Sequence, residues 1–203
     1  MSEHTVKNVV FDIGWVLVHL APTPLLQLLR AHGAEVEHLE HVMSRINLNE
    51  HESGRLDGAG LLFNIANLAP RRPSPELVAA AWADMFDPQP RMFRLAERLR
   101  SRYQVYLLSN VGDLHWVELQ RRFRLHELGH GVVTSFEAGV MKPHPDIYVQ
   151  TERRFSLNPA ETVFIDDRRE NIEAVRVRRW HGIVHAGHNE TVGALRALGV
   201  VTE

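Results

Sequence analysis

Short β-rich runs alternate with helical patterns through the second half of the chain. The β-rich runs are at 103–108, 131–134, 162–165 and 181–185, and helices are expected at 113–123, 145–155 and 169–178 and from about 189. Strands that alternate with helices form parallel sheets with right-handed crossovers. With a further strand at 7–11, the sequence predicts an α/β fold, a parallel sheet of about five strands with helices on both faces.

Residues 18–86 have a different pattern. Apolar side chains recur at spacings of three and four residues, first from 25 to 46 and again from 61 to 68, which is typical of amphipathic helices. Ser74 and Pro75 form a good helix start, with serine as the cap and proline in the first turn. No strand pattern is present between 18 and 85. We therefore expect a small helical cap, residues 18–86, inserted after the first strand of a core domain made of 1–17 and 87–203.

Polar residues stand at the ends of several strand-like runs. Asp12 ends the first strand, and Ser109-Asn110, Lys142-Pro143 and Asp166-Asp167 follow in that order. Taken singly, each is as well explained by a cap, a turn or a loop. Together they predict one site, because the ends of parallel strands converge on one crevice where ligands bind. The pattern predicts an enzyme that attacks an electrophile, a phosphoryl group above all, with Asp12.

The composition fits an ordinary folded protein and argues against a nucleic-acid or membrane partner. The 203 residues include 44% hydrophobic side chains and carry a formal net charge of -2, so there is no large positive field to attract nucleic acid. No apolar run approaches the roughly 20 residues that span a bilayer. The N-terminus is polar and cysteine is absent, so we expect a cytoplasmic protein without a signal peptide.

The residues around the polar strand ends resemble the four motifs of the haloacid dehalogenase-like (HAD) hydrolases. The resemblance rests on Asp12 in its hydrophobic strand and on residues 107–110, 139–148 and 164–171. It covers nearly the whole chain and implies a Rossmann-like core with a small helical cap after the first motif. Gly14 and the overall length look most like the alpha-D-glucose-1-phosphate phosphatase group of that family.

A divalent cation is expected beside the nucleophile. A phosphate monoester dianion repels an anion, so Asp12 can attack phosphorus only if a cation screens both groups. Mg²⁺ takes oxygen ligands and retains several waters, which makes Asp166 the natural second ligand after Asp12. The resemblance implies that the backbone carbonyl of Gly14 is a third ligand, with Asp167 bound through water or lying just outside the ligand set.

The remaining motif residues are the candidates for phosphate binding. Ser109 and Asn110, with nearby backbone N–H groups, would hold phosphoryl oxygens, and Lys142 would supply positive charge to the transferring group and to Asp12. The first step would form an aspartyl-phosphate, which water then hydrolyses. With Asp12, Ser109, Lys142 and Asp166 as the catalytic set, we predict a Mg²⁺-dependent phosphatase acting on a small phosphate ester such as a sugar phosphate.

Gly14 departs from the pattern of many phosphatases in the family, which carry a second aspartate there as general acid and base. Three hypotheses stay open: a phosphatase without this acid, a 2-haloacid dehalogenase that uses Asp12 without a metal, and a non-catalytic binding protein. The Asp166–Asp167 pair favours the phosphatase, because a dehalogenase acting on a carboxylate gains nothing from a carboxylate-rich site. The retained catalytic positions argue against a binding protein.

The substrate contacts are not predicted by the motifs. Trp15 stands where the family usually has a small residue, and it would stack on a sugar ring, pack beneath the cap or narrow the pocket. Residues of the cap select the substrate, and its polar candidates are His19, Asn47, Arg55 and Asn64. We expect a small phosphorylated molecule as the partner, and the sequence predicts no particular oligomeric state.

Overall fold

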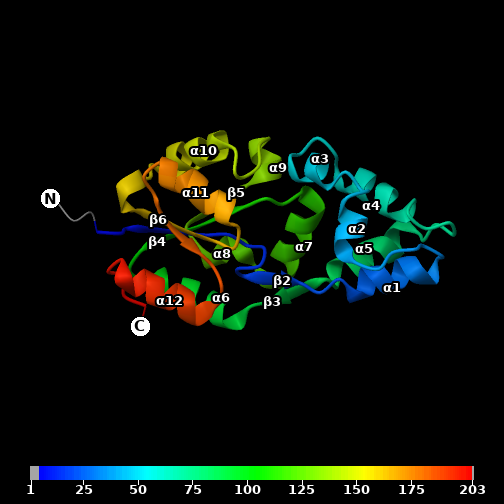
Figure 1. The fold of residues 1–203 in the computed structure, drawn as a ribbon, viewed down its shortest axis with the longest axis horizontal. Coiled ribbons are helices and arrows are strands. Elements are labelled where there is room, and N and C mark those ends of the chain that lie inside the picture. Colours follow the sequence, from blue (N-terminus) through cyan, green and yellow to red (C-terminus); the bar gives the residue numbers. More distant parts are fainter. Residues whose placement is uncertain (1–4, 203) are drawn as a thin grey trace.

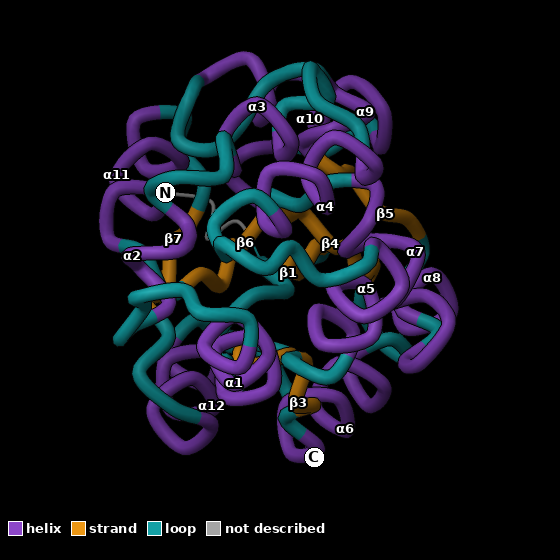
Figure 2. The backbone as a smooth tube through the Cα atoms, turned by 90° about the vertical axis from the view of Figure 1, so that its right-hand side faces the viewer, coloured by secondary structure: helices purple, strands orange, loops and turns teal. Residues whose placement is uncertain are grey.

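The fold is built around a sheet of five parallel strands. Figures 1 and 2 show in two views how helices surround this sheet. The structure was obtained as a computed structural model, which describes residues 5–202, so residues 1–4 and 203 of the predicted core domain lie outside it. The strand order is β5-β4-β1-β6-β7. The bounds are β1 (Asn8–Phe11), β4 (Gln104–Ser109), β5 (Gly131–Thr134), β6 (Thr162–Asp166) and β7 (His181–Val184). The predicted parallel α/β sheet is confirmed.

Helices cover both faces of this sheet because buried side chains alternate along each strand. Val9 and Phe11 of β1 point to one face, where they join a core that includes apolar residues of α6 (Pro90–Leu99), α7 (Asp113–Phe123) and α12 (His188–Ala197). Val10 points to the other face, toward α10 (Pro145–Phe155) and α11 (Arg169–Val177). Three short helices connect these elements: α8 (Leu125–Leu128), α9 (Ser135–Ala138) and the 3-10 turn η1 (Pro159–Glu161).

Residues 18–86, which follow β1, are mostly helical, and their helices lie at one end of the molecule (Figure 1). These helices are α1 (Thr23–Ala31), α2 (Leu39–Met43), α3 (Leu48–Glu52), α4 (Gly58–Ala66) and α5 (Pro75–Ala83). The Ser74 side chain caps α5 by accepting a hydrogen bond from the Leu77 N–H, as its sequence predicted. None of the helices in residues 5–202 is long and apolar enough to cross a membrane.

The expectation that this segment contains no strand was wrong. Strand β2 (Val18–Leu20) pairs antiparallel with β3 (Phe86–Pro88), so a two-stranded ribbon stands where the helical segment leaves and re-enters the rest of the fold. Each strand has only three residues, which is too short for an alternating pattern to be visible in the sequence. The division of the chain into a core and a cap at 17/18 and 86/87 stays a prediction.

Helix α3 is joined to the start of α7 by a buried histidine. His51 is completely buried, and its Nδ1 lies 2.9 Å from the carbonyl oxygen of Leu56. A Cβ added at Gly112 would come within 2.1 Å of His51 Nε2, so the close approach of the two segments requires glycine there. The His51 ring also lies 5.3 Å from the ring of His115 on α7.

His115 makes the stability of the fold sensitive to acid. Burial, helped by the nearby His51, lowers the pKa of His115 from 6.5 to about 3. In the unfolded chain His115 therefore takes up a proton as the pH falls through about 6.5, whereas in the folded chain it stays neutral until about pH 3. The contribution of neutral His115 to the free energy of unfolding is therefore fully present above the unfolded-state pKa. As the pH falls below that pKa, the free energy of unfolding decreases by about 1.4 kcal/mol per pH unit.

We expect His115→Leu to reduce the decrease in the free energy of unfolding between neutral and mildly acidic pH. Urea unfolding of both proteins at about pH 7.5 and about pH 5.5 measures it, since the unfolded-state pKa of histidine lies between those values. The wild type should lose more free energy of unfolding than the variant over this interval. Equal losses would show that His115 is not the group responsible.

Candidate active site

Asp12 follows the central strand of the sheet, at its carboxyl end. Its backbone N–H donates to the carbonyl oxygen of Ile165 at 2.9 Å, which ties this residue to the neighbouring strand β6. Its side chain is buried, and Asp12 Oδ1 accepts a hydrogen bond from the Ile13 N–H at 2.6 Å. Because β1 lies between β4 and β6, Asp12 stands between Ser109 at the end of β4 and Asp166 at the end of β6.

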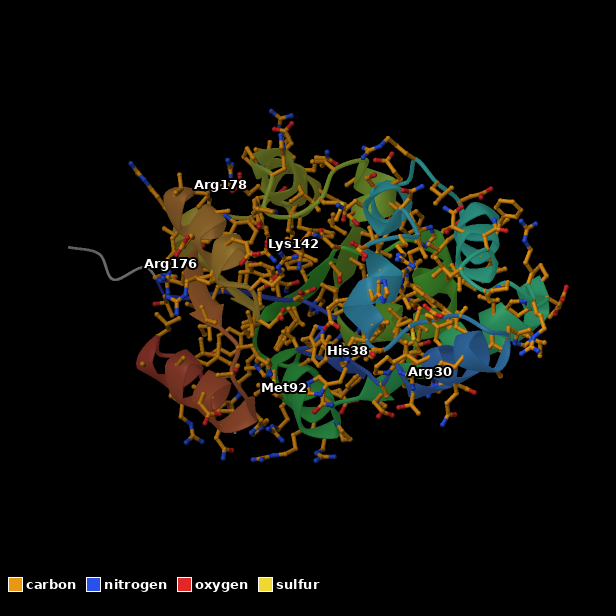
Figure 3. All side chains as sticks on the ribbon, turned by 45° about the vertical axis from the view of Figure 1, so that its right-hand side comes forward. Arg30, His38, Met92, Lys142, Arg176 and Arg178 are labelled. Atoms are coloured by element: carbon orange, nitrogen blue, oxygen red, sulfur yellow. The ribbon has the colours of Figure 1, made fainter. Side chains whose placement is uncertain are left out.

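A buried lysine joins two of these strand ends. Lys142 Nζ lies 2.9 Å from Asp12 Oδ1 and 2.7 Å from Asp166 Oδ2. Figure 3 shows Lys142 in the interior between the sheet and the inserted helices, whereas Arg176 and Arg178 lie at the outer end of the core. The fold places Lys142 in direct contact with Asp12 and Asp166, and its catalytic role stays a prediction.

Asn110 holds the lysine loop through its side chain. Its Nδ2 donates to the Lys142 carbonyl oxygen at 2.9 Å, and its Oδ1 accepts from the Lys142 N–H at 2.8 Å. Both the nitrogen and the oxygen of the Asn110 side-chain amide therefore bond to the backbone of Lys142. With the side chain engaged in this way, the backbone N–H of Asn110 is the group we expect to bind a phosphoryl oxygen, and this role stays a prediction.

Three carboxylates form a candidate metal site. One oxygen each from Asp12, Asp166 and Asp167 can be chosen so that all lie within 4.8 Å of one another. Asp166 is fixed by the Arg168 N–H at 2.8 Å and by Asn171 Nδ2, which lies 2.9 Å from each of its oxygens. An all-oxygen donor set of this kind suits a hard cation such as Mg²⁺ or Ca²⁺ and not a soft one.

The charges of the cluster favour a cation beside Asp12. Burial raises the pKa of Asp12 to about 7; the Lys142 ammonium opposes this rise and the Asp166 carboxylate adds to it. Burial acts to raise the pKa of Asp166 as well. The Lys142 ammonium and the hydrogen bonds from Arg168 and Asn171 outweigh this effect and hold the pKa of Asp166 below the usual range. Burial and the Asp166 charge raise the pKa of Asp167. A divalent cation would favour the ionised, nucleophilic form of Asp12.

Gly14 and Ser109 line one small pocket. The chain turns sharply after Asp12, with the Leu17 N–H donating to the Ile13 carbonyl oxygen at 2.9 Å. Gly14 of this turn lines the pocket together with Ser109, which is 3% exposed. Glu52 of α3 lines the same pocket and was not among the residues predicted from sequence. No local pattern marks it, because its position depends on how the inserted helices pack.

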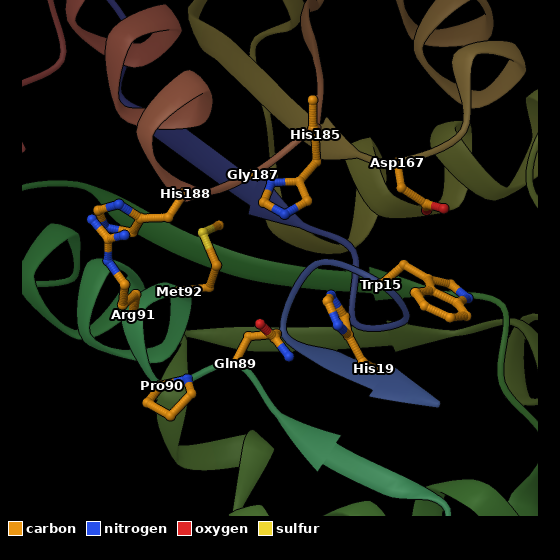
Figure 4. A pocket seen from close by; sticks show the side chains of 11 residues that line it. Trp15, His19, Gln89, Pro90, Arg91, Met92, Asp167, His185, Gly187 and His188 are labelled. Carbon is orange, nitrogen blue, oxygen red and sulfur yellow. The ribbon is translucent and has the colours of Figure 1, made fainter. Parts of the chain in front are cut away.

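Trp15 lines a second, larger cavity of about 500 Å³ (Figure 4). Its side chain is 46% exposed, and its ring lies 5.2 Å from that of His19. Asp167 and His185 line the same cavity. Because the ring is exposed at the cavity wall, contact with a ligand or narrowing of the cavity is favoured over packing of Trp15 beneath the cap. The contact of Trp15 with the substrate stays a prediction.

The four polar residues considered for substrate contact are separated by the fold. His19 lines the cavity of Trp15, and Arg55 lines an open pocket beside Lys142. Asn64 instead donates to the carbonyl oxygen of Ile46 at 3.1 Å, so its amide is engaged within the inserted helices. Asn47 is exposed at the start of α3.

Residues 7–177 match the family described as haloacid dehalogenase-like hydrolase. The chain belongs to this family. The match agrees with the order of the strand-end residues, and it identifies the chain as a hydrolase of the HAD type. The narrower resemblance to the alpha-D-glucose-1-phosphate phosphatase group stays a prediction.

Relatives of known activity include two sugar- or polyol-phosphate phosphatases. The D-ribitol-5-phosphate phosphatase of Bacteroides thetaiotaomicron is 28% identical over 176 residues, which cover 82% of this chain and 85% of that protein. The glyceraldehyde 3-phosphate phosphatase of Methanopyrus kandleri is 32% identical over 125 residues, 53% of each protein. A HAD-family enzyme from B. thetaiotaomicron, crystallised as a magnesium complex, superimposes with a TM-score of 0.78 at 25% identity, over 89% of this chain and 93% of that one.

Proposed function

We propose that this HAD hydrolase is a Mg²⁺-dependent phosphatase that hydrolyses a small phosphate ester, with Asp12 as the nucleophile. The observation that carries the proposal is the buried contact of Lys142 Nζ with both Asp12 and Asp166, at 2.9 and 2.7 Å, inside a cluster of three carboxylates. A nucleophile, a fixed cation and a set of hard oxygen ligands then meet at one point, which is what phosphoryl transfer requires.

Asp12, Asp166 and the Gly14 carbonyl would hold the ion, with Asp167 beside it or bound through water. When bound, Mg²⁺ supplies positive charge that screens the phosphoryl oxygens from the nucleophile. The protein's own contribution is to keep these oxygens in place. Asn171 and the Arg168 N–H orient Asp166, and an oriented ligand loses less entropy when it binds an ion.

The reaction has two displacement steps at phosphorus. An Asp12 oxygen attacks phosphorus while the bond to the ester oxygen breaks, which gives an aspartyl-phosphate. Water then attacks the same phosphorus, the bond to Asp12 breaks, and inorganic phosphate leaves. Lys142 stabilises negative charge on the transferring group in both steps, and Ser109 and the Asn110 N–H would hold its oxygens.

Sugar or polyol phosphates are the substrates we propose. Both phosphatases compared above act on phosphorylated compounds of that class, as their names state. The cavity lined by Trp15, His19 and Gln89 offers an aromatic face and hydrogen-bonding groups next to Asp167, which suits a polyhydroxylated chain or ring (Figure 4).

A dehalogenase acting on 2-haloacids fits this site less well. Its substrate carries a carboxylate, which three neighbouring aspartates would repel unless a cation were present. A non-catalytic binding protein has no need of a lysine in contact with the nucleophilic position. The phosphatase is therefore the function that the geometry supports best.

Phosphate release separates these functions directly. We expect the protein to release phosphate from para-nitrophenyl phosphate and from ribitol 5-phosphate when Mg²⁺ is present, and to stop when the metal is chelated. We expect no chloride release from 2-chloropropionate without metal. Chloride release combined with no phosphate release would replace the phosphatase by the dehalogenase, and no release of either would favour a binding protein.

A further inference from the structure

The position where many HAD phosphatases carry an acid beside the nucleophile is open in this protein. Gly14 has no side chain, and a Cβ built on it would meet no heavy atom within 4 Å. Without a proton donor, the ester oxygen would have to depart as an alkoxide or take its proton from water. Any group that replaces the missing acid must face the pocket that Gly14 lines.

One residue that lines this pocket, Glu52, carries a carboxyl group. It ends helix α3, and it lines the pocket together with Gly14, Ser109 and Asn110. Burial raises the pKa of Glu52 to about 8; Lys142 lowers it, the Asp12 charge raises it and Arg168 lowers it. The Glu52 carboxyl is thus close enough to the nucleophile for their charges to interact, and its raised pKa favours the protonated form near neutral pH.

The backbone of Glu52 is fastened to the loop that follows β4. The buried Ser135 hydroxyl donates to the Glu52 carbonyl oxygen and accepts from the Val111 N–H at 2.9 Å. A Cβ at Gly54 would lie 2.4 Å from the Phe136 carbonyl oxygen, so the two segments are in close contact just after Glu52. Ser135 therefore sets the position of Glu52 relative to the loop that carries Ser109 and Asn110.

We propose that Glu52 is the general acid and base of the reaction, and that it replaces the aspartate that Gly14 lacks. The inference rests on the phosphatase function proposed above and assigns it a further catalytic residue. The proton donor would then come from the inserted helices and not from the turn after β1.

The proton moves twice in each turnover. In the first step the Glu52 carboxyl gives its proton to the ester oxygen as the bond from that oxygen to phosphorus breaks, so the product leaves as a neutral alcohol. In the second step the Glu52 carboxylate takes a proton from the attacking water as oxygen bonds to phosphorus and the bond to Asp12 breaks. Glu52 is again protonated, and Asp12 is again free.

Glu52→Gln tests this role because it keeps the shape of the side chain and removes the proton. The matched control is Glu50→Gln, on the same helix α3, where the carboxylate is exposed and pairs with Arg55 instead of facing the pocket. The probes are para-nitrophenyl phosphate, whose leaving group needs no proton, and glycerol phosphate, whose alkoxide needs one.

We expect Glu52→Gln to lower turnover of glycerol phosphate by roughly 10²–10⁴-fold, the usual contribution of general acid catalysis. With para-nitrophenyl phosphate, the variant should release a rapid burst of about one nitrophenolate per enzyme. It should then turn over slowly, because only the second step lacks its base. Glu50→Gln should behave as the wild type with both probes.

Two results would overturn the assignment while leaving the phosphatase function intact. One is a Glu52→Gln variant that hydrolyses both esters as fast as the wild type. The other is an equal loss for both esters without a burst, which would mean that Glu52 supports the fold or binding and transfers no proton. A wild-type protein inactive on both esters would instead refute the phosphatase function, and this inference with it.

Discussion

Asp12→Asn is expected to abolish turnover, with kcat lower by on the order of 10⁴–10⁶-fold, as when the nucleophile of a hydrolase is removed. An amide cannot form the aspartyl-phosphate, and the neighbouring aspartates are committed to other roles. The substitution should not destabilise the fold, because burial already raises the pKa of Asp12 to about 7, so an ionised carboxylate is costly there.

Steady-state release of phosphate with Mg²⁺ measures this loss, and rapid quenching followed by mass spectrometry locates the phosphoryl group. The wild type should carry it on the peptide that contains Asp12, and Asp12→Asn should carry none. Asp84→Asn, an exposed aspartate that follows α5, is a control for the substitution itself. Retained activity in Asp12→Asn, or a phosphoryl group on another residue, would contradict the covalent mechanism.

Asp166→Asn is expected to remove the response to magnesium. Asp166 accepts hydrogen bonds from Lys142 Nζ at 2.7 Å, from the Arg168 N–H and from Asn171 Nδ2, so both of its oxygens are held in place. Losing even an outer partner of a metal ligand lowers metal affinity by roughly 10–100-fold, so losing a ligand should lower it by at least about 100-fold. Activity at low magnesium should disappear.

Calorimetric titration of Mg²⁺ into the wild type and the variant tests the metal site without relying on turnover. Glu173→Gln, an exposed carboxylate on α11, controls for the loss of one negative charge nearby. Circular dichroism should show the same fold in all three proteins. Unchanged Mg²⁺ affinity and unchanged magnesium dependence in Asp166→Asn would exclude this residue as a ligand.

The strand-end residues could be predicted from sequence because their environment is local. A β-rich run, a polar residue at its end and a following helix are all visible over a few consecutive positions. Asp12, Ser109 and Asp166 each end such a run, and the carboxyl ends of parallel strands share one edge of a sheet. The sequence by itself therefore determined the fold class and the strand-end residues that the fold brings close to Asp12.

The tertiary structure alone decided which of these groups touch and what faces them. The order β4-β1-β6 places Asp12 in the middle. This order depends on pairing between residues 96 and 154 positions apart in the chain, which no local pattern contains. The same holds for the β2–β3 ribbon, for the Asn110 amide on the lysine loop, and for Glu52. Glu52 reaches the pocket because buried groups such as His51 and Ser135 fasten α3 to the core, and such long-range packing is set by the whole fold.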